Sequence, residues 1–361
     1  MHDIVVVGAG PVGSMLASLC AKELDVLVLE EDDMAGRKAC SGLVSKRFVG
    51  MLPRKVRNGD IVRHKVKAAI IHLEGKALEL RQRDYAYVLD RDRLDTLMAR
   101  HAQGCGAQIR YGESVTKISE GKGCMAALSN GKPYEASVIC GCDGARSVAA
   151  RHMNVGPVEI LNGLIIHEKR RASEDFVEMW FCSAALPDGF FWKIPRGDCM
   201  EYGCMGKAVN FKSLERFFSL HGRGGLSRAA APIPIGSAER TYADRMILAG
   251  DAAGQTKPWS GGGLTYGLIA AGCAAKTLEE ASIKRDFSAA LLSGYERSWK
   301  GILSRDIGAG MLLREMLKDM DPGALSSIVA AAGALSGRAA GIDFDFPFSG
   351  VLGKAVRLNG E

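Results

Sequence analysis

The sequence predicts an α/β (α+β) fold in which a Rossmann-like domain is interleaved with a mainly antiparallel β-sheet domain and followed by C-terminal helices. Three observations support this prediction. The chain opens with a buried strand, a glycine turn, a helix and a second strand, which together form a βαβ unit. Residues 157–240 are rich in aromatic residues and alternate as strands do. Residues 301–361 have helical patterning with frequent alanine and glycine.

Length and charge limit what the chain can be. Its 361 residues suffice for two joined lobes, because single cores stop growing near about 250–300 residues. A net charge of +6, without a Lys/Arg run longer than three, does not favour nucleic acid as a partner. The absence of a signal peptide and of a long apolar stretch predicts a cytoplasmic protein. Its weakly basic surface is compatible with peripheral contact with an anionic membrane.

No repeat or linker separates the lobes, so we expect them to be interleaved in sequence. The ten cysteines are scattered without a CxxC pair, and we therefore expect no metal site or cluster. The predicted dinucleotide-binding domain comprises residues 1–55, 81–155 and 241–300. Residues 56–80 and 156–240 form the predicted substrate-binding sheet domain, and residues 301–361 the C-terminal helical segment.

Residues 8–13 (GAGPVG) follow the first strand and open a helix, as a dinucleotide site requires. Gly8, Gly10 and Gly13 permit a tight turn and close approach of a pyrophosphate, whose charge the helix N-terminus stabilises. Glu30 ends the second strand, where it could hold a ribose hydroxyl. A turn required only for packing is the alternative. This motif alone does not separate NAD from FAD.

Two later stretches also lie where a strand runs into a turn: residues 142–147 (CDGARS) and 247–254 (ILAGDAAG). Together with the first motif they resemble the FAD-binding set of the para-hydroxybenzoate hydroxylase-like flavoprotein superfamily. The resemblance implies FAD as cofactor, with Gly250 and Asp251 at its ribityl chain and pyrophosphate and Asp143 among the binding residues. Either glycine–aspartate pair alone would be an ordinary turn.

A third glycine cluster, residues 258–263 (PWSGGG), precedes a helix that begins near Leu264. The bare backbone N–H groups of Gly261, Gly262 and Gly263 suit the N1/C2=O edge of a flavin, which becomes anionic on reduction. A flexible glycine loop is the alternative, but it leaves the neighbouring Gly250-Asp251 stretch unexplained.

Residues 188–198 (DGFFWKIPRGD) alternate like a strand, with Phe190, Trp192 and Ile194 on one side. With Pro195 they resemble the aromatic–Trp–Phe–Pro–Lys segment of the geranylgeranyl reductase family. Residues 38–42 (KACSG) resemble its Cys-Gly-Gly loop, and residues 88–95 its Arg-x-x-Phe-Asp helix start. The resemblance spans residues 1–310 in motif order. This chain differs by having Ser41, Ile194 and Arg196 at matching positions, which affects the substrate more than the chemistry.

The resemblance implies that Phe190, Trp192, Ile194 and Pro195 line an apolar cavity over the isoalloxazine, where an isoprenoid chain lies. Plain core packing of the sheet is the alternative reading of these residues. The resemblance also places Arg91 near the cofactor, and we add Arg37, beside the cysteine loop, to the cofactor-binding residues.

The implied activity is FAD-dependent saturation of C=C bonds in geranylgeranyl chains, most plausibly those of archaeal-type ether lipids or their precursors. Such a reduction needs hydride from reduced flavin N5 and a proton for the other carbon. Cys40 is the candidate acid, because an ordinary thiol, with a pKa of about 8.5, is protonated at neutral pH. A buried, inert cysteine is the alternative. Each buried CH₂ contributes about 0.8 kcal/mol, so apolar walls can hold a polyprenyl chain and should tolerate several.

No second glycine motif is present for a nicotinamide, so we expect NAD(P)H, ferredoxin or another carrier to dock transiently. The alternative function is a flavin-dependent monooxygenase or halogenase of an aromatic substrate. Halogenases carry a Trp-x-Trp-x-Ile-Pro segment, but here Phe190 stands in place of the first tryptophan and no catalytic-lysine region is evident. An electron carrier of the quinone-linked type should have cluster cysteines near its C-terminus, and none follows Cys273. A lipid-binding protein without catalysis would have no need of Gly250-Asp251 and the glycine-rich helix start.

Overall fold

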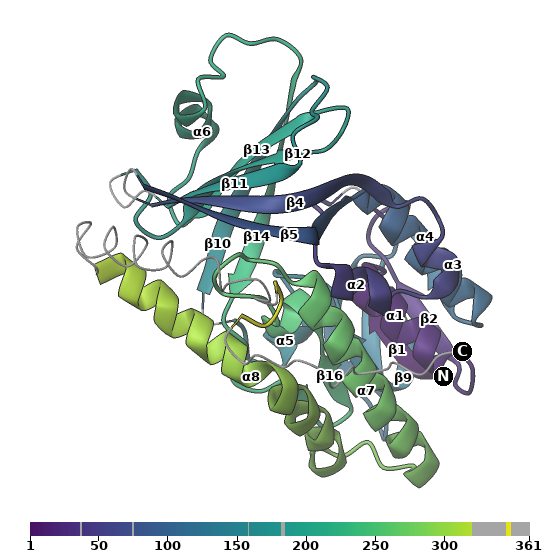
Figure 1. Ribbon diagram of the computed structural model, residues 1–361. Coiled ribbons are helices and arrows are strands. Elements are labelled where there is room, and N and C mark those ends of the chain that lie inside the picture. The colour runs from purple at the N-terminus through teal and green to yellow at the C-terminus, as the bar shows by residue number, and fades with distance from the viewer. Residues whose placement is uncertain (37, 74–75, 158, 182–184, 320–343, 348–361) are drawn as a thin grey trace.

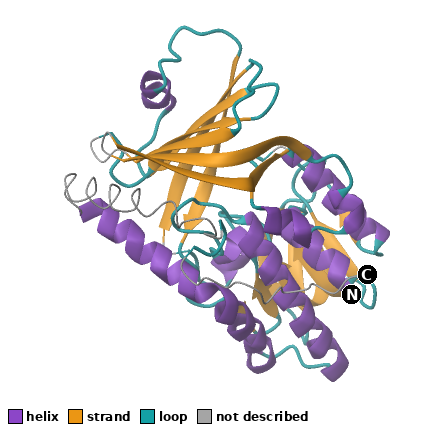
Figure 2. Cartoon of the chain, in the orientation of Figure 1, coloured by secondary structure: helices purple, strands orange, loops and turns teal. Residues whose placement is uncertain are grey.

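The computed structural model describes residues 1–361 except residues 37, 74–75, 158, 182–184, 320–343 and 348–361. Within the described residues the strands form two sheets of eight strands each (Figure 1). Helices gather around the first sheet, and the second sheet stands beyond it as a separate layer (Figure 2). The predicted fold class, a Rossmann-like part with an antiparallel sheet and C-terminal helices, is confirmed.

The first sheet has a parallel centre in the order β16-β9-β1-β2-β6. Strands β1 and β2 are runs of valine, leucine and isoleucine buried on both faces, as parallel strands require. Antiparallel strands extend this centre: β15 beside β16, and the hairpin of β7 and β8 beside β9. Its strands are β1 (His2–Val7), β2 (Val26–Leu29), β6 (Gln108–Arg110), β7 (Val115–Glu120), β8 (Met125–Ser129), β9 (Lys132–Gly141), β15 (Tyr242–Ala243) and β16 (Met246–Leu248).

Helices cover one face of this sheet, where the largest hydrophobic core lies between α1, α4, α7 and the strands. A smaller core on the other face lies under the β7–β8 hairpin and α5. Helix α4 begins as predicted, with Asp90 as its N-cap accepting from the Arg93 backbone N–H at 3.1 Å. The helices are α1 (Pro11–Cys20), α2 (Lys46–Met51), α3 (Arg54–Arg57), α4 (Arg91–Gly104), α5 (Val148–His152), α6 (Phe211–Phe217), the 3₁₀ helix η1 (Gly250–Ala253), α7 (Leu264–Lys284) and α8 (Ala289–Asp319).

The second sheet has the order β14-β10-β13-β12-β11-β4-β5-β3 and is antiparallel except where β11 pairs with β4. Its outer face carries an aromatic cluster under α6, in which Phe191 stacks on Phe217 with ring centroids 3.9 Å apart. Its inner face turns toward the first sheet. Its strands are β3 (Leu43–Val44), β4 (Val62–Leu73), β5 (Lys76–Leu89), β10 (Glu159–Glu168), β11 (Phe176–Phe181), β12 (Phe190–Pro195), β13 (Met200–Gly206) and β14 (Leu226–Ile235).

Two predicted boundaries fall inside elements. Strands β4 and β5 pair antiparallel, and β5 continues past residue 81, the predicted start of a dinucleotide-binding segment, while remaining in the second sheet. Helix α8 runs from Ala289 to Asp319 and crosses the predicted boundary at 300. Of the predicted C-terminal segment, the structure describes residues 301–319 and 344–347. No helix in the part of the chain that the structure describes is long and apolar enough to cross a bilayer.

Helix α8 is fastened to the first sheet by its aromatic residues. The hydroxyl of Tyr295 donates to the Leu248 carbonyl at 2.7 Å, and the Trp299 indole donates to the Thr241 hydroxyl at 2.9 Å. Trp299 is 1% exposed, so its ring fills space that no other group occupies. The helix is therefore held by buried contacts along its first half.

We expect Trp299→Ala to lower the free energy of unfolding by about 3–5 kcal/mol, because it leaves a cavity and removes the hydrogen bond from the indole to Thr241. Arg297→Ala, on the exposed side of the same helix, should change it by less than about 0.5 kcal/mol. Denaturant unfolding of the two variants measures both values. Equal unfolding of the two would contradict this account of how α8 is held.

Candidate active site

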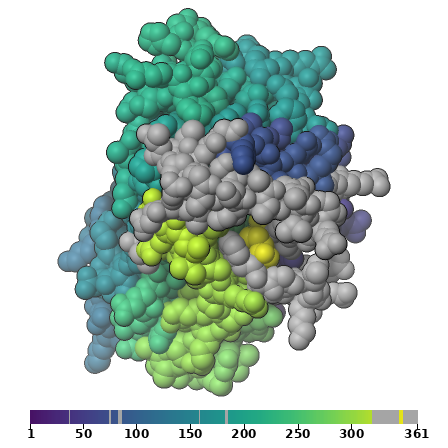
Figure 3. All heavy atoms as spheres, turned by 60° about the vertical axis from the view of Figure 1, so that its left-hand side comes forward, coloured from purple at the N-terminus to yellow at the C-terminus, as the bar shows by residue number. Residues whose placement is uncertain are grey.

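A cavity of about 1490 Å³ lies between the carboxyl ends of the parallel strands β1 and β2 and the inner face of the second sheet. This is the position at which open parallel sheets bind ligands. Helix α8 closes one side of it with Leu313 and Leu317. Residues 344–347, yellow in Figure 3, lie beside α8, and Phe344 and Pro347 also line the cavity. Segments that are far apart in sequence therefore share one cavity.

The first glycine turn lies at the cavity and is tightly packed. A Cβ on Gly8 would come within 2.6 Å of the Cys142 carbonyl oxygen, and one on Gly13 within 2.0 Å of the Gly8 oxygen. Neither position tolerates a side chain, and the backbone of Gly8 and Gly10 lines the cavity, where it is open to a ligand. Helix α1 starts at Pro11 after Gly10, without a side-chain cap or an acidic residue in its first turn. Its N-terminus can therefore accept a pyrophosphate.

Glu30 lies at the end of β2, as predicted, and is 5% exposed. One carboxylate oxygen accepts from the Ala9 backbone N–H at 2.6 Å and the other from that of Asp32 at 3.1 Å. Burial raises the pKa of Glu30 above its ordinary value. Each oxygen keeps a second lone pair, so Glu30 can support the glycine turn and still accept from a ligand hydroxyl.

The two aspartates of the later motifs differ in their surroundings. Asp143 accepts from the Ser147 hydroxyl and the Val148 backbone N–H, each at 2.6 Å, and so caps α5. Asp251 has no side-chain hydrogen bond to any residue that the structure describes, although it lines the cavity. Burial raises the pKa of Asp251, and only Arg91 opposes that effect. A partially buried carboxylate without a partner needs a donor, which a bound polyol chain would supply.

The glycine cluster before α7 contributes a second open backbone segment. Gly261, Gly262 and Gly263 line the cavity, and α7 begins after Gly263 without a side-chain cap or an acidic residue in its first turn. A Cβ on Gly263 would come within 2.5 Å of the Asp251 carboxylate. The Ser260 hydroxyl is buried and has no partner among the described residues. These groups fit a flavin as the resemblance implies.

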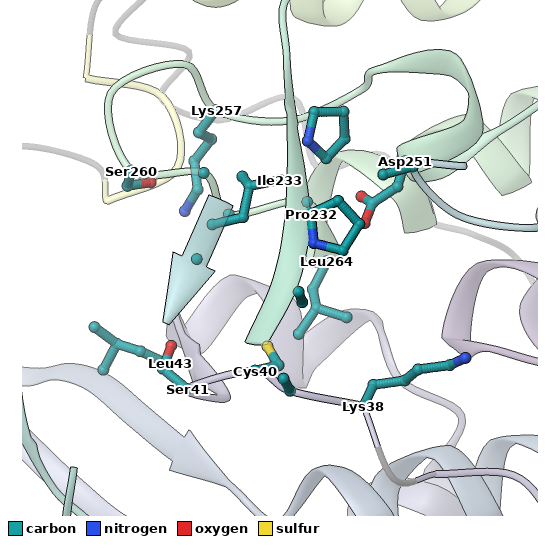
Figure 4. A pocket seen from close by; sticks show the side chains of 18 of the residues that line it. Lys38, Cys40, Ser41, Leu43, Pro232, Ile233, Asp251, Lys257, Ser260 and Leu264 are labelled. Atoms are coloured by element: carbon teal, nitrogen blue, oxygen red, sulfur yellow. The ribbon is translucent and has the colours of Figure 1, made fainter. Parts of the chain in front are cut away.

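The cysteine loop approaches the same cavity from the opposite side. Figure 4 shows Cys40 and Lys38 on one side, with Asp251 and Lys257 across from them. The Cys40 sulfur accepts from the Gly42 backbone N–H at 3.4 Å, and the Arg91 guanidinium lies beside it. Arg91 also binds both oxygens of Asp95, at 3.1 and 2.9 Å. The structure therefore brings Cys40 and Arg91 together at the cavity.

The aromatic strand forms one wall of the cavity. Phe190, Trp192 and Ile194 of β12 line it, while Phe191 points to the outer face, so the predicted alternation is confirmed. The rings of Phe181 and Phe190 stack with centroids 5.1 Å apart, and Trp192 follows at 5.6 Å from Phe190. Further apolar residues of the same sheet complete the wall: Ala69, Ile71, Leu73, Leu80, Val177 and Met179.

Not every predicted residue lines the cavity. Gly13 packs against Gly8, and Gly250 packs against Val12, and neither lines the cavity. Pro195 is buried at the end of β12. Arg37 lies outside the described residues. No group of three or more His, Cys, Asp or Glu side chains suited to a metal occurs in the ranges the structure describes.

Sequence reasoning missed Lys257, which is 4% exposed, lines the cavity and binds Asp345 at 3.0 Å. Its ammonium also lies 4.2 Å from the centre of the Phe344 ring. Its position directly before the glycine cluster was the available signal. A lone lysine in a loop ordinarily predicts exposure, and the sequence contains nothing that links it to an aspartate 88 residues later.

Residues 1–184 match the model of the FAD binding domain family, and the chain belongs to this family. FAD is its cofactor. It is 28% identical to digeranylgeranylglycerophospholipid reductase 1 of Methanococcoides burtonii, over 90% of this chain and 87% of that protein. The recognised resemblance to geranylgeranyl reductases is thereby confirmed.

Solved structures share the fold. A geranylgeranyl bacteriochlorophyll reductase-like protein from Thermoplasma acidophilum superposes with a TM-score of 0.82 at 22% identity, covering 92% of this chain and 91% of that one. The halogenase PltM in complex with phloroglucinol and FAD gives a TM-score of 0.69 at 15% identity, covering 88% and 76%. At these identities the likeness is one of fold.

We expect Gly13→Ala to abolish retention of FAD, because the added methyl must displace the Gly8 carbonyl from the turn that faces the cofactor. Gly104→Ala is the matched control, since a Cβ there meets no atom within 4 Å. The flavin absorbance per protein after gel filtration measures the difference. A Gly13→Ala protein that keeps its full complement of flavin would show that the turn does not hold the cofactor.

Proposed function

We propose that this chain is an FAD-dependent reductase that saturates C=C bonds of geranylgeranyl chains, in archaeal-type ether lipids or their precursors. The observation that supports it best is the apolar wall of β12 and its neighbours, in one cavity with the glycine turns that suit FAD. The relatives' names point to the same class of substrate. Reduced FAD supplies the hydride in such a reaction.

The walls supply binding energy without polar recognition. Each CH₂ that leaves water contributes about 0.8 kcal/mol, so a long prenyl chain gains several kcal/mol from apolar contacts alone. Phe181, Phe190 and Trp192 present broad ring surfaces to such a chain.

Cys40 is the residue we propose for delivery of the proton. It lines the cavity beside the residues predicted to face the flavin, and its sulfur is oriented by the Gly42 backbone N–H. The adjoining Arg91 is engaged with Asp95 through two hydrogen bonds, so its guanidinium stays fixed beside the thiol. The chain thus places a thiol in the cavity that the glycine turns and the apolar wall share.

The electron donor and the membrane contact also belong to this proposal. The reductant, whether NAD(P)H, ferredoxin or another carrier, docks transiently. Helix α8 exposes Leu312 (61%) and Met316 (50%), and Met316 also lines the cavity together with Leu313 and Leu317. Exposed apolar residues beside the cavity support peripheral contact with the membrane from which a lipid would enter.

We expect the dithionite-reduced holoenzyme to be reoxidised anaerobically by a digeranylgeranyl glycerolipid, with a gain of two hydrogens per reduced bond. Flavin absorbance and lipid mass spectrometry record the two events. A fully saturated lipid of the same length is the control. If flavin reoxidation requires oxygen and the lipid mass is unchanged, the monooxygenase or halogenase alternative replaces this function.

We expect Cys40→Ala to lower anaerobic turnover by at least about a hundredfold while FAD stays bound, because it removes the proposed acid. Cys124→Ser, in the β7–β8 turn, should leave turnover unchanged. Stopped-flow flavin oxidation under single-turnover conditions measures both. Turnover that survives in Cys40→Ala would assign the proton to another group.

A further inference from the structure

Arg196 follows β12 directly and is 7% exposed, which is unusual for an arginine. Its guanidinium donates to the carbonyl of Ser41 and to that of Leu89, the latter at 3.3 Å. It also donates to a Glu201 carboxylate oxygen at 3.0 Å. A planar guanidinium can serve acceptors in several directions at once, whereas an ammonium group cannot reproduce this fork.

The two carbonyls belong to the segments that bear Cys40 and Arg91. Ser41 directly follows Cys40, and Leu89 precedes Arg91 by two residues. The segments already touch, since the Leu89 backbone N–H donates to the Gly42 carbonyl at 2.9 Å and β3 pairs with the end of β5. Arg196 binds both at this junction, so it limits how far Cys40 can move from Arg91.

Glu201 connects the same arginine to the cavity wall. It is fully buried, and its second oxygen accepts from the Trp192 indole at 2.8 Å. The Trp192 ring lies across Gly203, where a Cβ would come within 2.1 Å of the indole. His167 also contacts Glu201, at 3.0 Å. The indole is thus held both by its hydrogen bond to Glu201 and by its packing on the backbone of Gly203.

We propose that Arg196 and Glu201 form a positioning unit that sets the Cys40 loop at a fixed offset from the Trp192 wall. The inference rests on the proposed function, in which the prenyl chain lies against that wall and the proton comes from Cys40. The unit thereby fixes the distance between the Cys40 thiol and the carbon of the prenyl chain that receives the proton. Neither residue of the pair reacts; both act through the groups they hold.

A purely structural role is the competing explanation, because a buried ion pair that loses one partner destabilises a protein in any location. The contacts of Arg196 distinguish the two. A structural pair would lower stability only. A positioning pair also changes the exposure and reactivity of Cys40, which can be measured without substrate.

The test uses the FAD-loaded protein with Arg196→Met, Arg196→Lys and the control Lys193→Met. Lys193 lies on the same strand and binds Glu178 at 2.9 Å, so its loss removes an ion pair that does not involve Ser41 or Leu89. Maleimide labelling of Cys40 is followed by peptide mass spectrometry. Thermal unfolding and single-turnover rates are measured on the same samples.

We expect Arg196→Met to label roughly tenfold faster at Cys40 and to lose kcat more than it raises KM. Arg196→Lys should lie between it and the wild type, and Lys193→Met should match the wild type. If Arg196→Met does not fold, the double variant Arg196→Met/Glu201→Gln, which removes both charges, is measured in its place with the same expectation.

Unchanged labelling and kcat in a folded, flavin-bound Arg196→Met protein would overturn the proposal, even if its unfolding temperature fell. Faster labelling in Lys193→Met to the same extent would overturn it as well. Labelling needs no lipid, so it tests the positioning unit even if the wild type reduces no prenyl chain. In that case the proposed function fails and the contact between Arg196 and the Cys40 loop is still measured.

Discussion

The structure depends on one close contact, made by backbone where three distant segments meet. Gly8 packs against the Cys142 backbone, and Gly13 against the Gly8 carbonyl, so tightly that neither could carry a side chain. The side chain of Val12, between them, packs against Gly250 and Gly267. A Cβ on Gly250 would come within 3.0 Å of the Val12 side chain, and one on Gly267 within 2.5 Å. Strand β1, the end of β9, η1 and α7 are thereby fixed together. Two helices, α1 and α7, begin at one cavity without side-chain caps as a consequence.

This backbone contact explains why the glycine motifs could be recognised in the sequence. A glycine is required wherever two backbones touch, so the turns at residues 8–13, 250 and 261–263 were evident from composition. The wall of β12 was evident from its alternation, since a strand with one face on a cavity repeats every two residues. The start of α4 after Asp90 was likewise a local pattern. Local chemistry predicted these elements because each is determined by residues adjacent in sequence.

The parts that sequence reasoning missed depend on pairing between distant residues. The pairing of Lys257 with Asp345 joins positions 88 residues apart, and a single sequence has no signal for it. The course of β5 past residue 81 follows from its ladder with β4, whose length depends on both strands. Such features require the tertiary structure.

Ion pairing around the cavity explains how charged residues and an apolar wall coexist. Three nearly buried pairs surround it among the described residues: Arg91 with Asp95, Arg196 with Glu201, and Lys257 with Asp345. Each pair is internally neutral, and a single unpaired charge at such depth would cost several kcal/mol. A carboxylate outside these pairs, Asp251, lies beside Gly263 of the glycine cluster and across the cavity from Cys40 (Figure 4). The three pairs neutralise charge beside the cavity, while the wall of β12 presents Phe190, Trp192 and Ile194 to it.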